Sequence, residues 1–117
     1  RIRMAEQLRG FDLDLSTGEL VVNGHRVFFV TASEAMTSSD SVEDTGLVAW
    51  DGGFVLAKYL EEQLGNKFLK EIGILELGSG CGLVGICAAA CGAKVILTDK
   101  EYCLALIKKN IELNSDA

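Results

Sequence analysis

The second half of the chain alternates between two hydrophobic patterns. Residues 72–77 (IGILEL) and 94–99 (KVILTD) are short, nearly all-apolar runs typical of buried parallel strands. Residues 83–92 and 101–114 follow them with helical spacing, and the first of these helices is built of small residues and ends at Gly92. Strand, helix, strand, helix at these lengths predicts a right-handed βαβ unit in a parallel sheet. The apolar stripe of the second helix consists of Cys103, Leu104, Ile107 and Ile111.

Upstream of that unit, a β-rich stretch is followed by a polar one. Residues 18–30 place Asn23 and Gly24 between two β-rich runs. An Asn-Gly pair in this position predicts a two-residue hairpin, because both central positions of a type I′ turn need positive φ. Residues 31–46 are rich in Ser, Thr, Asp and Glu, show no apolar period and predict a loop.

Residues 51–64 predict a helix with Asp51 as N-cap and Gly65 just past its end. One side of this helix is apolar and the other carries charge, which is the pattern of a helix lying on a larger body. The apolar side consists of Leu56, Ala57, Leu60 and Leu64, and the polar side of Lys58, Glu61 and Glu62. We therefore expect an N-terminal extension of hairpin and polar loop over residues 1–50, followed by a second unit of helices and parallel strands over residues 51–117.

The turn between the first predicted strand and its helix, GSGCGLVG, carries four glycines in eight residues. In a parallel sheet this turn lies where ligands bind, and glycines let the backbone turn sharply and approach the ligand closely. Gly80, Gly82 and Gly85 spell the G-x-G-x-x-G of dinucleotide-binding loops. Glu76, at the end of the strand, opposes that interpretation, because its carboxylate would repel the pyrophosphate that a dinucleotide places on the helix N-terminus.

The same acid favours a cationic ligand. S-adenosylmethionine (SAM) brings an ammonium group and a sulfonium to this region and has no phosphate. The pattern acid-x-Gly-x-Gly-x-Gly from Glu76 to Gly82 therefore suits SAM better than a dinucleotide. Asp99 ends the second strand, where an acidic side chain can accept hydrogen bonds from both ribose hydroxyls of an adenosine. Capping of the helix that follows explains Asp99 equally well.

Composition narrows the class of protein further. A net charge of -6 argues against nucleic acid as the main partner, and the apolar runs are too short to cross a membrane. The cysteines form no C-x-x-C pair and His25 is far from them in sequence, so we expect no metal site. Free buried thiols suit the cytoplasm or the nucleus, and Cys87 and Cys91 would pack as small apolar residues on one helix face. The full set is Cys81, Cys87, Cys91 and Cys103.

Three segments together resemble the family 16 lysine methyltransferases, the methyltransferase-like 21 group of seven-strand class I enzymes. They are TGLVAWDGGFVLAKYLEEQ, ILELGSGCGLVGICAAACGAKVILTD and NIELN, between Thr45 and Asn114. The resemblance implies an α/β, Rossmann-like class I methyltransferase fold. It also implies a SAM-dependent protein-lysine N-methyltransferase that acts on the lysine side chains of a protein substrate and is a monomer at full length.

The resemblance further implies roles for individual residues. Trp50 matches a tryptophan that lines the SAM site, the segment from Gly78 to Gly80 matches the loop around the methionine end, and Asp99 matches the ribose-binding acid. The predicted cofactor-binding residues are therefore Trp50, Glu76, Gly78, Ser79, Gly80, Gly82 and Asp99.

Two asparagines, Asn110 and Asn114, match the N-I-x-x-N pattern of the same family, and helix capping explains them equally well. No residue of the chain is assigned as a catalytic base or other catalytic group.

Measured against a seven-strand sheet, the chain supplies only part of the fold. We expect the N-terminal hairpin, the first two parallel strands and their helices, with the acceptor-lysine pocket after residue 117. On this interpretation the sequence is a fragment or short isoform. Two alternatives stay open, namely half of an NAD(P)-dependent oxidoreductase and a non-catalytic interaction module. The sequence does not discriminate lysine from arginine, histidine or a small molecule as the methyl acceptor.

Overall fold

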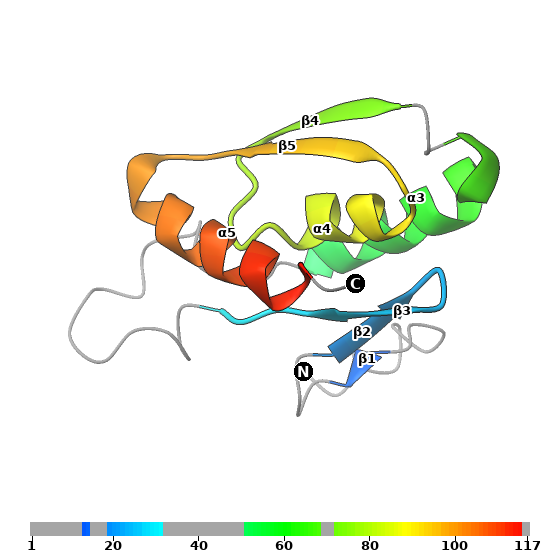
Figure 1. Cartoon of the computed structure of the whole chain (residues 1–117), viewed down its shortest axis with the longest axis horizontal. Coiled ribbons are helices and arrows are strands. Elements are labelled where there is room, and N and C mark those ends of the chain that lie inside the picture. Colours follow the sequence, from blue (N-terminus) through cyan, green and yellow to red (C-terminus); the bar gives the residue numbers. More distant parts are fainter. Residues whose placement is uncertain (1–12, 15–18, 32–50, 69–71, 116–117) are drawn as a thin grey trace.

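The computed structural model describes residues 13–14, 19–31, 51–68 and 72–115. The elements are β1 (Leu13–Asp14), β2 (Glu19–Val22), β3 (His25–Phe28), α3 (Asp51–Phe68), β4 (Gly73–Leu77), α4 (Leu83–Ala90), β5 (Lys94–Thr98) and α5 (Glu101–Leu113). Figure 1 shows them in three layers, with the helices between the parallel pair β4–β5 and the antiparallel sheet β1–β2–β3. The expected mixed α/β arrangement with a parallel strand pair is present. The predicted loop at 31–46, apart from Thr31, lies outside the described residues.

The N-terminal hairpin forms as the sequence predicts. β2 and β3 pair antiparallel with Val22 opposite His25, and the turn between them has positive φ at Asn23 (52°) and Gly24 (75°). Val22 and Val27 point into the core and are buried, while His25 is exposed. The alternation of buried and exposed residues is the pattern of a sheet with one face packed and one face in solvent.

The predicted strand-helix-strand unit is also confirmed. β4 and β5 run parallel, with Ile74 opposite Val95 and Glu76 opposite Leu97, and α4 connects them. One face of the pair rests on the helices, because Ile74, Val95 and Leu97 pack against the core.

The other face of this strand pair is apolar and open. Leu77 is 77% exposed and Ile96 65% exposed, so within the described residues the strands are buried on one face only. The sequence pattern predicts strands buried on both faces, and within the described residues only one face is buried. The helices of the described residues are too short or too polar to cross a membrane.

The end of α4 depends on one glycine. Gly92 takes a left-handed φ of 101° and its N–H donates to Ala89 O at 2.8 Å, while the N–H of Ala93 donates to Ala88 O at 3.1 Å. These two bonds form a Schellman motif, which satisfies carbonyls that the helix end would leave free. The chain then turns directly into β5.

The end predicted for α3 is wrong. The helix contains Asp51 as its first residue, not as its N-cap, and continues through Gly65 to Phe68. A glycine inside a helix costs about 1 kcal/mol relative to alanine, but it ends a helix only where it takes a left-handed conformation.

The buried face of α3 also differs from the prediction. Phe54 and Ala57 are buried, whereas Leu56 is 47% exposed. The ring of Phe54 packs on Phe29, with centroids 5.8 Å apart, so the contact with the segment after β3 sets which face of the helix turns inward. Of the predicted apolar side, Ala57 is confirmed, Leu60 is partly buried, and the side chain of Leu64 lies outside the described part.

The stripe predicted for α5 is right for Cys103 and Ile107 and wrong for Leu104 and Ile111, which are exposed. The buried positions are instead Cys103, Leu106, Ile107 and Asn110. A polar side chain takes a core position here because both its amide oxygen and its amide nitrogen are hydrogen-bonded.

The cysteines behave as predicted for small apolar residues. Cys87 and Cys91 are buried, and burial raises the pKa of the Cys87 thiol to about 12. A thiol held neutral in this way packs as a hydrophobe.

The packing of α4 on the strands leaves no room at Gly85. A Cβ there would collide with Leu97 and lie 2.6 Å from Glu76 Oε2, whereas a Cβ at Gly53 of α3 would make ordinary contacts at 3.6 Å with Leu83 and Val84. We expect Gly85→Ala to lower the free energy of unfolding by about 1–3 kcal/mol through overpacking. Gly53→Ala should raise it by up to about 1 kcal/mol through helix propensity. Urea unfolding measures both, and equal or greater stability of Gly85→Ala would contradict this packing.

Candidate functional site

The turn from β4 into α4 is built on three glycines with positive φ. Gly78, Gly80 and Gly82 have φ values of 67°, 58° and 85°, in a region that side-chain-bearing residues rarely adopt. A Cβ on Gly78 would meet nothing within 4 Å, so this part of the backbone faces open space. A Cβ on Gly82 would instead lie 3.2 Å from Leu97 in the core. We call residues 78–82 the glycine loop.

Ser79 braces the glycine loop against β5. Its hydroxyl donates to Glu76 O (3.2 Å) and accepts the N–H of Thr98 (3.1 Å), and its own N–H donates to Thr98 O (2.9 Å). Ser79 O also accepts the N–H of Gly82 at 2.8 Å. The side chain is 7% exposed, and its hydroxyl serves the shape of the loop.

Asp99 joins the glycine loop to the end of β5. Its Oδ2 accepts the N–H of Gly80 at 2.7 Å and its Oδ1 accepts the N–H of Lys100 at 2.6 Å. The Gly80 hydrogen bond is the main cause that lowers the pKa of the Asp99 carboxyl. Lys100, not Asp99, occupies the N-cap of α5, so the capping explanation of Asp99 is wrong. A carboxylate has about four acceptor sites, so Asp99 keeps acceptor capacity for a ligand.

Glu76 faces α4 from the carboxyl end of β4. Its Oε2 is buried and has no hydrogen-bond partner among the described residues. Burial raises the pKa of the Glu76 carboxyl, the backbone N–H of Gly85 partly opposes the rise, and the carboxylate of Asp99 adds to it. The glycine loop is thus flanked by two acids. Their carboxylates attract cations and hydrogen-bond donors and repel phosphate.

Asn110 is a residue for which sequence reasoning found no specific role. It lies inside α5, with 0% exposure, and its Nδ2 donates to Cys81 O of the glycine loop at 2.7 Å. It is therefore not a helix cap, whereas Asn114 is the C-cap residue of α5. The sequence did contain a signal for this role, because the helical period assigns Asn110 to the core, where an asparagine is unusual.

The predicted site residues thus fall into two groups. The structure brings six of them together around the glycine loop, and Trp50 lies outside the described residues. The six are Glu76, Gly78, Ser79, Gly80, Gly82 and Asp99.

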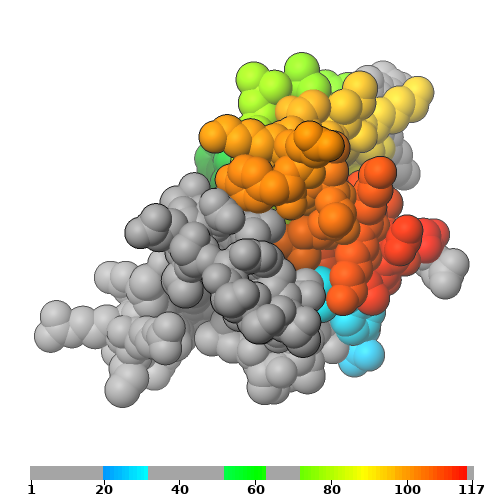
Figure 2. Space-filling view, turned by 90° about the vertical axis from the view of Figure 1, so that its left-hand side faces the viewer, coloured from blue at the N-terminus to red at the C-terminus, as the bar shows by residue number. Residues whose placement is uncertain are grey.

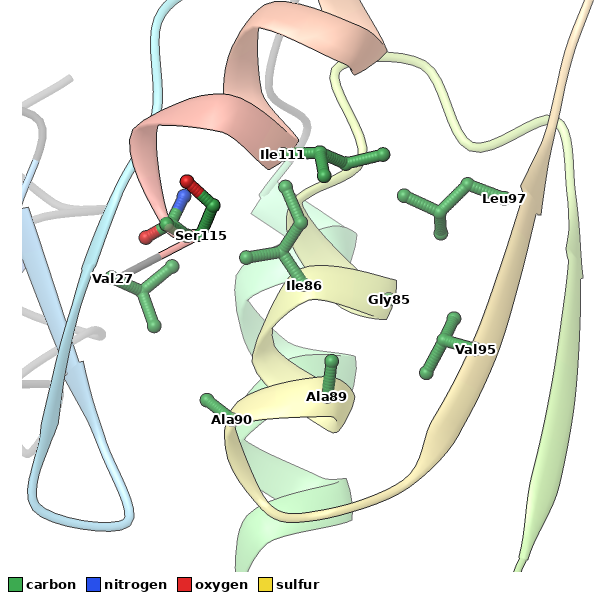
Figure 3. A pocket seen from close by; sticks show the side chains of 10 residues that line it. Val27, Gly85, Ile86, Ala89, Ala90, Val95, Leu97, Ile111 and Ser115 are labelled. Carbon is green, nitrogen blue, oxygen red and sulfur yellow. The ribbon is translucent and has the colours of Figure 1, made fainter. Parts of the chain in front are cut away.

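A cavity of about 330 Å³ lies elsewhere, between α4, β5 and the end of α5 (Figure 3). Its described lining residues carry no charge, and none of the six site residues is among them. The lining is mostly apolar, so the chemistry of the glycine loop is separate from this cavity. The side chains that dominate its walls are Val27, Ile86, Val95, Leu97 and Ile111.

The fold and the site define a mixed α/β protein in which a glycine-rich turn and two acids meet at the carboxyl ends of a parallel strand pair, as expected for part of a methyltransferase domain. A family model described as "Lysine methyltransferase" matches residues 31–117, and the chain belongs to this family.

Individual relatives are also named as protein methyltransferases. The chain is 46% identical over 67 residues to protein N-lysine methyltransferase METTL21A of Mus musculus, covering 57% of this chain and 30% of that protein. It is 39% identical over 88 residues to METTL21A of Danio rerio, covering 74% and 39% respectively. It is 38% identical over 73 residues to histone-arginine methyltransferase METTL23 of Mus musculus, covering 60% and 28%. The chain therefore spans about a third of the length of the curated relatives it matches.

The two acids should respond to pH in opposite ways. The folded-state pKa of Glu76 is raised, so its ionisation costs stability once the pH exceeds the unfolded value. We expect Glu76→Gln to raise the free energy of unfolding at neutral pH and to have little effect near pH 3, about one unit below the unfolded pKa of a glutamate. Urea unfolding at the two pH values measures this.

Asp99→Asn is the matched comparison. The folded-state pKa of Asp99 is lowered, so its contribution is present above the unfolded pKa and is lost as the pH falls through the folded one. This variant should lower stability at neutral pH. A Glu76→Gln protein that is less stable than wild type at neutral pH would contradict the assignment of Glu76 as a desolvated carboxylate.

Proposed function

We propose that the protein is a SAM-dependent protein-lysine N-methyltransferase, and that the described residues contribute part of its SAM site. The observation that carries the proposal is the glycine loop with an acid at the end of each strand. Membership of the lysine methyltransferase family supports the reaction and the protein substrate. When bound, SAM supplies a methyl group on a positively charged sulfur.

The geometry supports a division of roles around the cofactor. Gly78 offers backbone with open space where a Cβ would otherwise stand, which suits close approach of the methionine end of SAM. Asp99 keeps acceptor capacity beyond its two backbone bonds, which suits the ribose hydroxyls. Glu76 presents a partly buried carboxylate whose Oε2 lacks a partner among the described residues, and a cationic ligand nearby would favour its ionised form.

Two other predicted residues have a structural role in the proposed site. Ser79 and Gly82 hold the shape of the glycine loop, since the hydroxyl of the first is engaged with β5 and the second points into the core. Trp50 stays a proposal that rests on the family resemblance. We likewise propose residues 1–50 as an extension and 51–117 as the N-terminal part of the SAM domain, in a monomeric protein of the cytoplasm or nucleus.

The oxidoreductase alternative loses its main support. Gly85 is the third glycine of the G-x-G-x-x-G pattern, and its lack of a Cβ lets α4 approach Leu97 and Val95. Two carboxylates beside the loop also disfavour a pyrophosphate. Arginine as acceptor has one observation in its favour, the relative named a histone-arginine methyltransferase, while the family description and METTL21A point to lysine.

Calorimetric titration of the intact protein tests the cofactor. We expect heat of binding with SAM and none with NAD. Asp99→Ala should weaken SAM about 10- to 100-fold, because each hydrogen bond to a charged group contributes about 1.5–3 kcal/mol. Glu112→Ala, an exposed acid on α5, is the control and should bind as wild type. Binding of NAD alone would overturn the proposal.

SAM affinity should also depend on pH through Glu76. The ionised form of this carboxyl favours a cationic ligand, and its pKa is raised, so SAM binding should strengthen as the pH rises through that pKa. Glu76→Gln should weaken binding about 10-fold at neutral pH and flatten this dependence. The measurement is the SAM dissociation constant across pH, with Glu112→Gln as the control, and an unchanged profile in Glu76→Gln would exclude this role.

A further inference from the structure

Two side-chain amides of α5 pair with the extended chain at β3. Asn110 Oδ1 accepts the N–H of Val30 at 2.7 Å and its Nδ2 donates to Val30 O at 3.0 Å. Asn114 Oδ1 accepts the N–H of Phe28 at 2.8 Å and its Nδ2 donates to Phe28 O at 2.6 Å. Residues four apart on a helix lie about 6 Å apart along its axis, and residues two apart on a strand about 6.6 Å, so the two spacings match.

The two asparagines therefore act like an additional strand beside residues 28–30. Figure 1 shows this segment running along α5, and in Figure 2 the cyan atoms of the same segment lie against the orange and red atoms of that helix. Phe28 and Val30 are two residues apart in extended chain, so both present their backbone groups toward α5.

Asn110 makes one contact that Asn114 does not. Its Nδ2 also donates to Cys81 O, at 2.7 Å, in the middle of the glycine loop. Both donors and the acceptor of this amide are thereby used, and the residue is fully buried. Asn114 instead places its second donor bond on Asn110 O within the same helix, at 2.7 Å. One amide of the pair thus reaches the loop and the other does not.

The Cys81 carbonyl is a sensitive point of the glycine loop. It stands between Gly80, whose N–H is held by Asp99, and Gly82, the N-cap of α4. This carbonyl belongs to the peptide that joins Cys81 to Gly82, and the glycine on that side lacks the steric limits that other residues place on rotation of the peptide. The bond from Asn110 fixes the direction of the carbonyl, and removing it would leave the carbonyl buried without that donor.

We propose that Asn110 is a positioning residue of the SAM site, which holds the glycine loop in its binding geometry through Cys81 O, and that Asn114 serves only to attach α5 to β3. This inference rests on the proposed function. The loop is then anchored from β5 by Thr98 and Asp99 and from α5 by Asn110, which also links it to the N-terminal strand.

A matched pair of variants in the intact protein tests the proposal. Asn110→Ser and Asn114→Ser each remove an amide pairing with the strand, but only the first removes the bond to Cys81. We expect Asn110→Ser to weaken SAM binding about 10-fold and Asn114→Ser to change it by less than about 3-fold, at a temperature where circular dichroism shows both folded. Equal losses in the two variants, or none in Asn110→Ser, would overturn the proposal.

A second readout is independent of SAM. Amide hydrogen exchange of a peptide spanning residues 78–83 should accelerate about 10-fold in Asn110→Ser and stay near wild type in Asn114→Ser. If wild type binds no SAM, the proposed function fails. The exchange data then decide the role of Asn110 by themselves, since a selective rise supports it and an unchanged rate overturns it.

A third measurement needs no variant, in case Asn110→Ser does not fold. In wild-type protein the side-chain amide resonances of Asn110 should shift on SAM titration more than those of Asn114. Shifts of equal size would overturn the proposal.

Discussion

The shape of the glycine loop is the constraint on which the rest of the site depends. Three positive φ values within residues 78–82 are cheap only for glycine, and a glycine-rich segment loses more conformational entropy on ordering than any other. Neighbours must therefore impose the shape. Thr98 holds Ser79, Asp99 holds the N–H of Gly80, and Asn110 holds Cys81 O. The parallel register of β4 and β5 places Thr98 and Asp99 beside the loop. The geometry of the site therefore depends on the pairing of these two strands.

The two acids at this loop show how environment separates chemically similar groups. Asp99 is solvated and receives backbone N–H groups, which lowers its pKa, while Glu76 is partly buried against Gly85, which raises its pKa. A half-buried carboxylate without a full set of partners costs stability. Under the proposed function, a cationic cofactor would offset that cost by favouring the ionised carboxylate.

The N-terminal hairpin belongs to the same packed unit as the loop. Val22 and Val27 enter the common core, and the N–H of Asn23 donates to Glu61 Oε2 of α3 at 2.8 Å. The pairing of Asn110 and Asn114 with β3 adds a second attachment. The helical layer is thus covered on both sides, whereas the far face of β4–β5 stays open within the described residues.

The sequence by itself determined the local elements. Asn-Gly predicted the hairpin, alternating apolar runs predicted the βαβ unit, and the acid before the glycines favours a cationic ligand over a phosphate in the proposed site. Only the tertiary structure decided which helix faces turn inward, because Phe54 on Phe29 and the buried Asn110 override the simple apolar count. It also decided which glycines face open space and which face the core. Gly78 faces open space, and Gly82 and Gly85 face the core. Local sequence encodes propensity and period, while the direction of a side chain or a missing Cβ depends on segments far away in the chain, here α5 and β3 across about 80 residues.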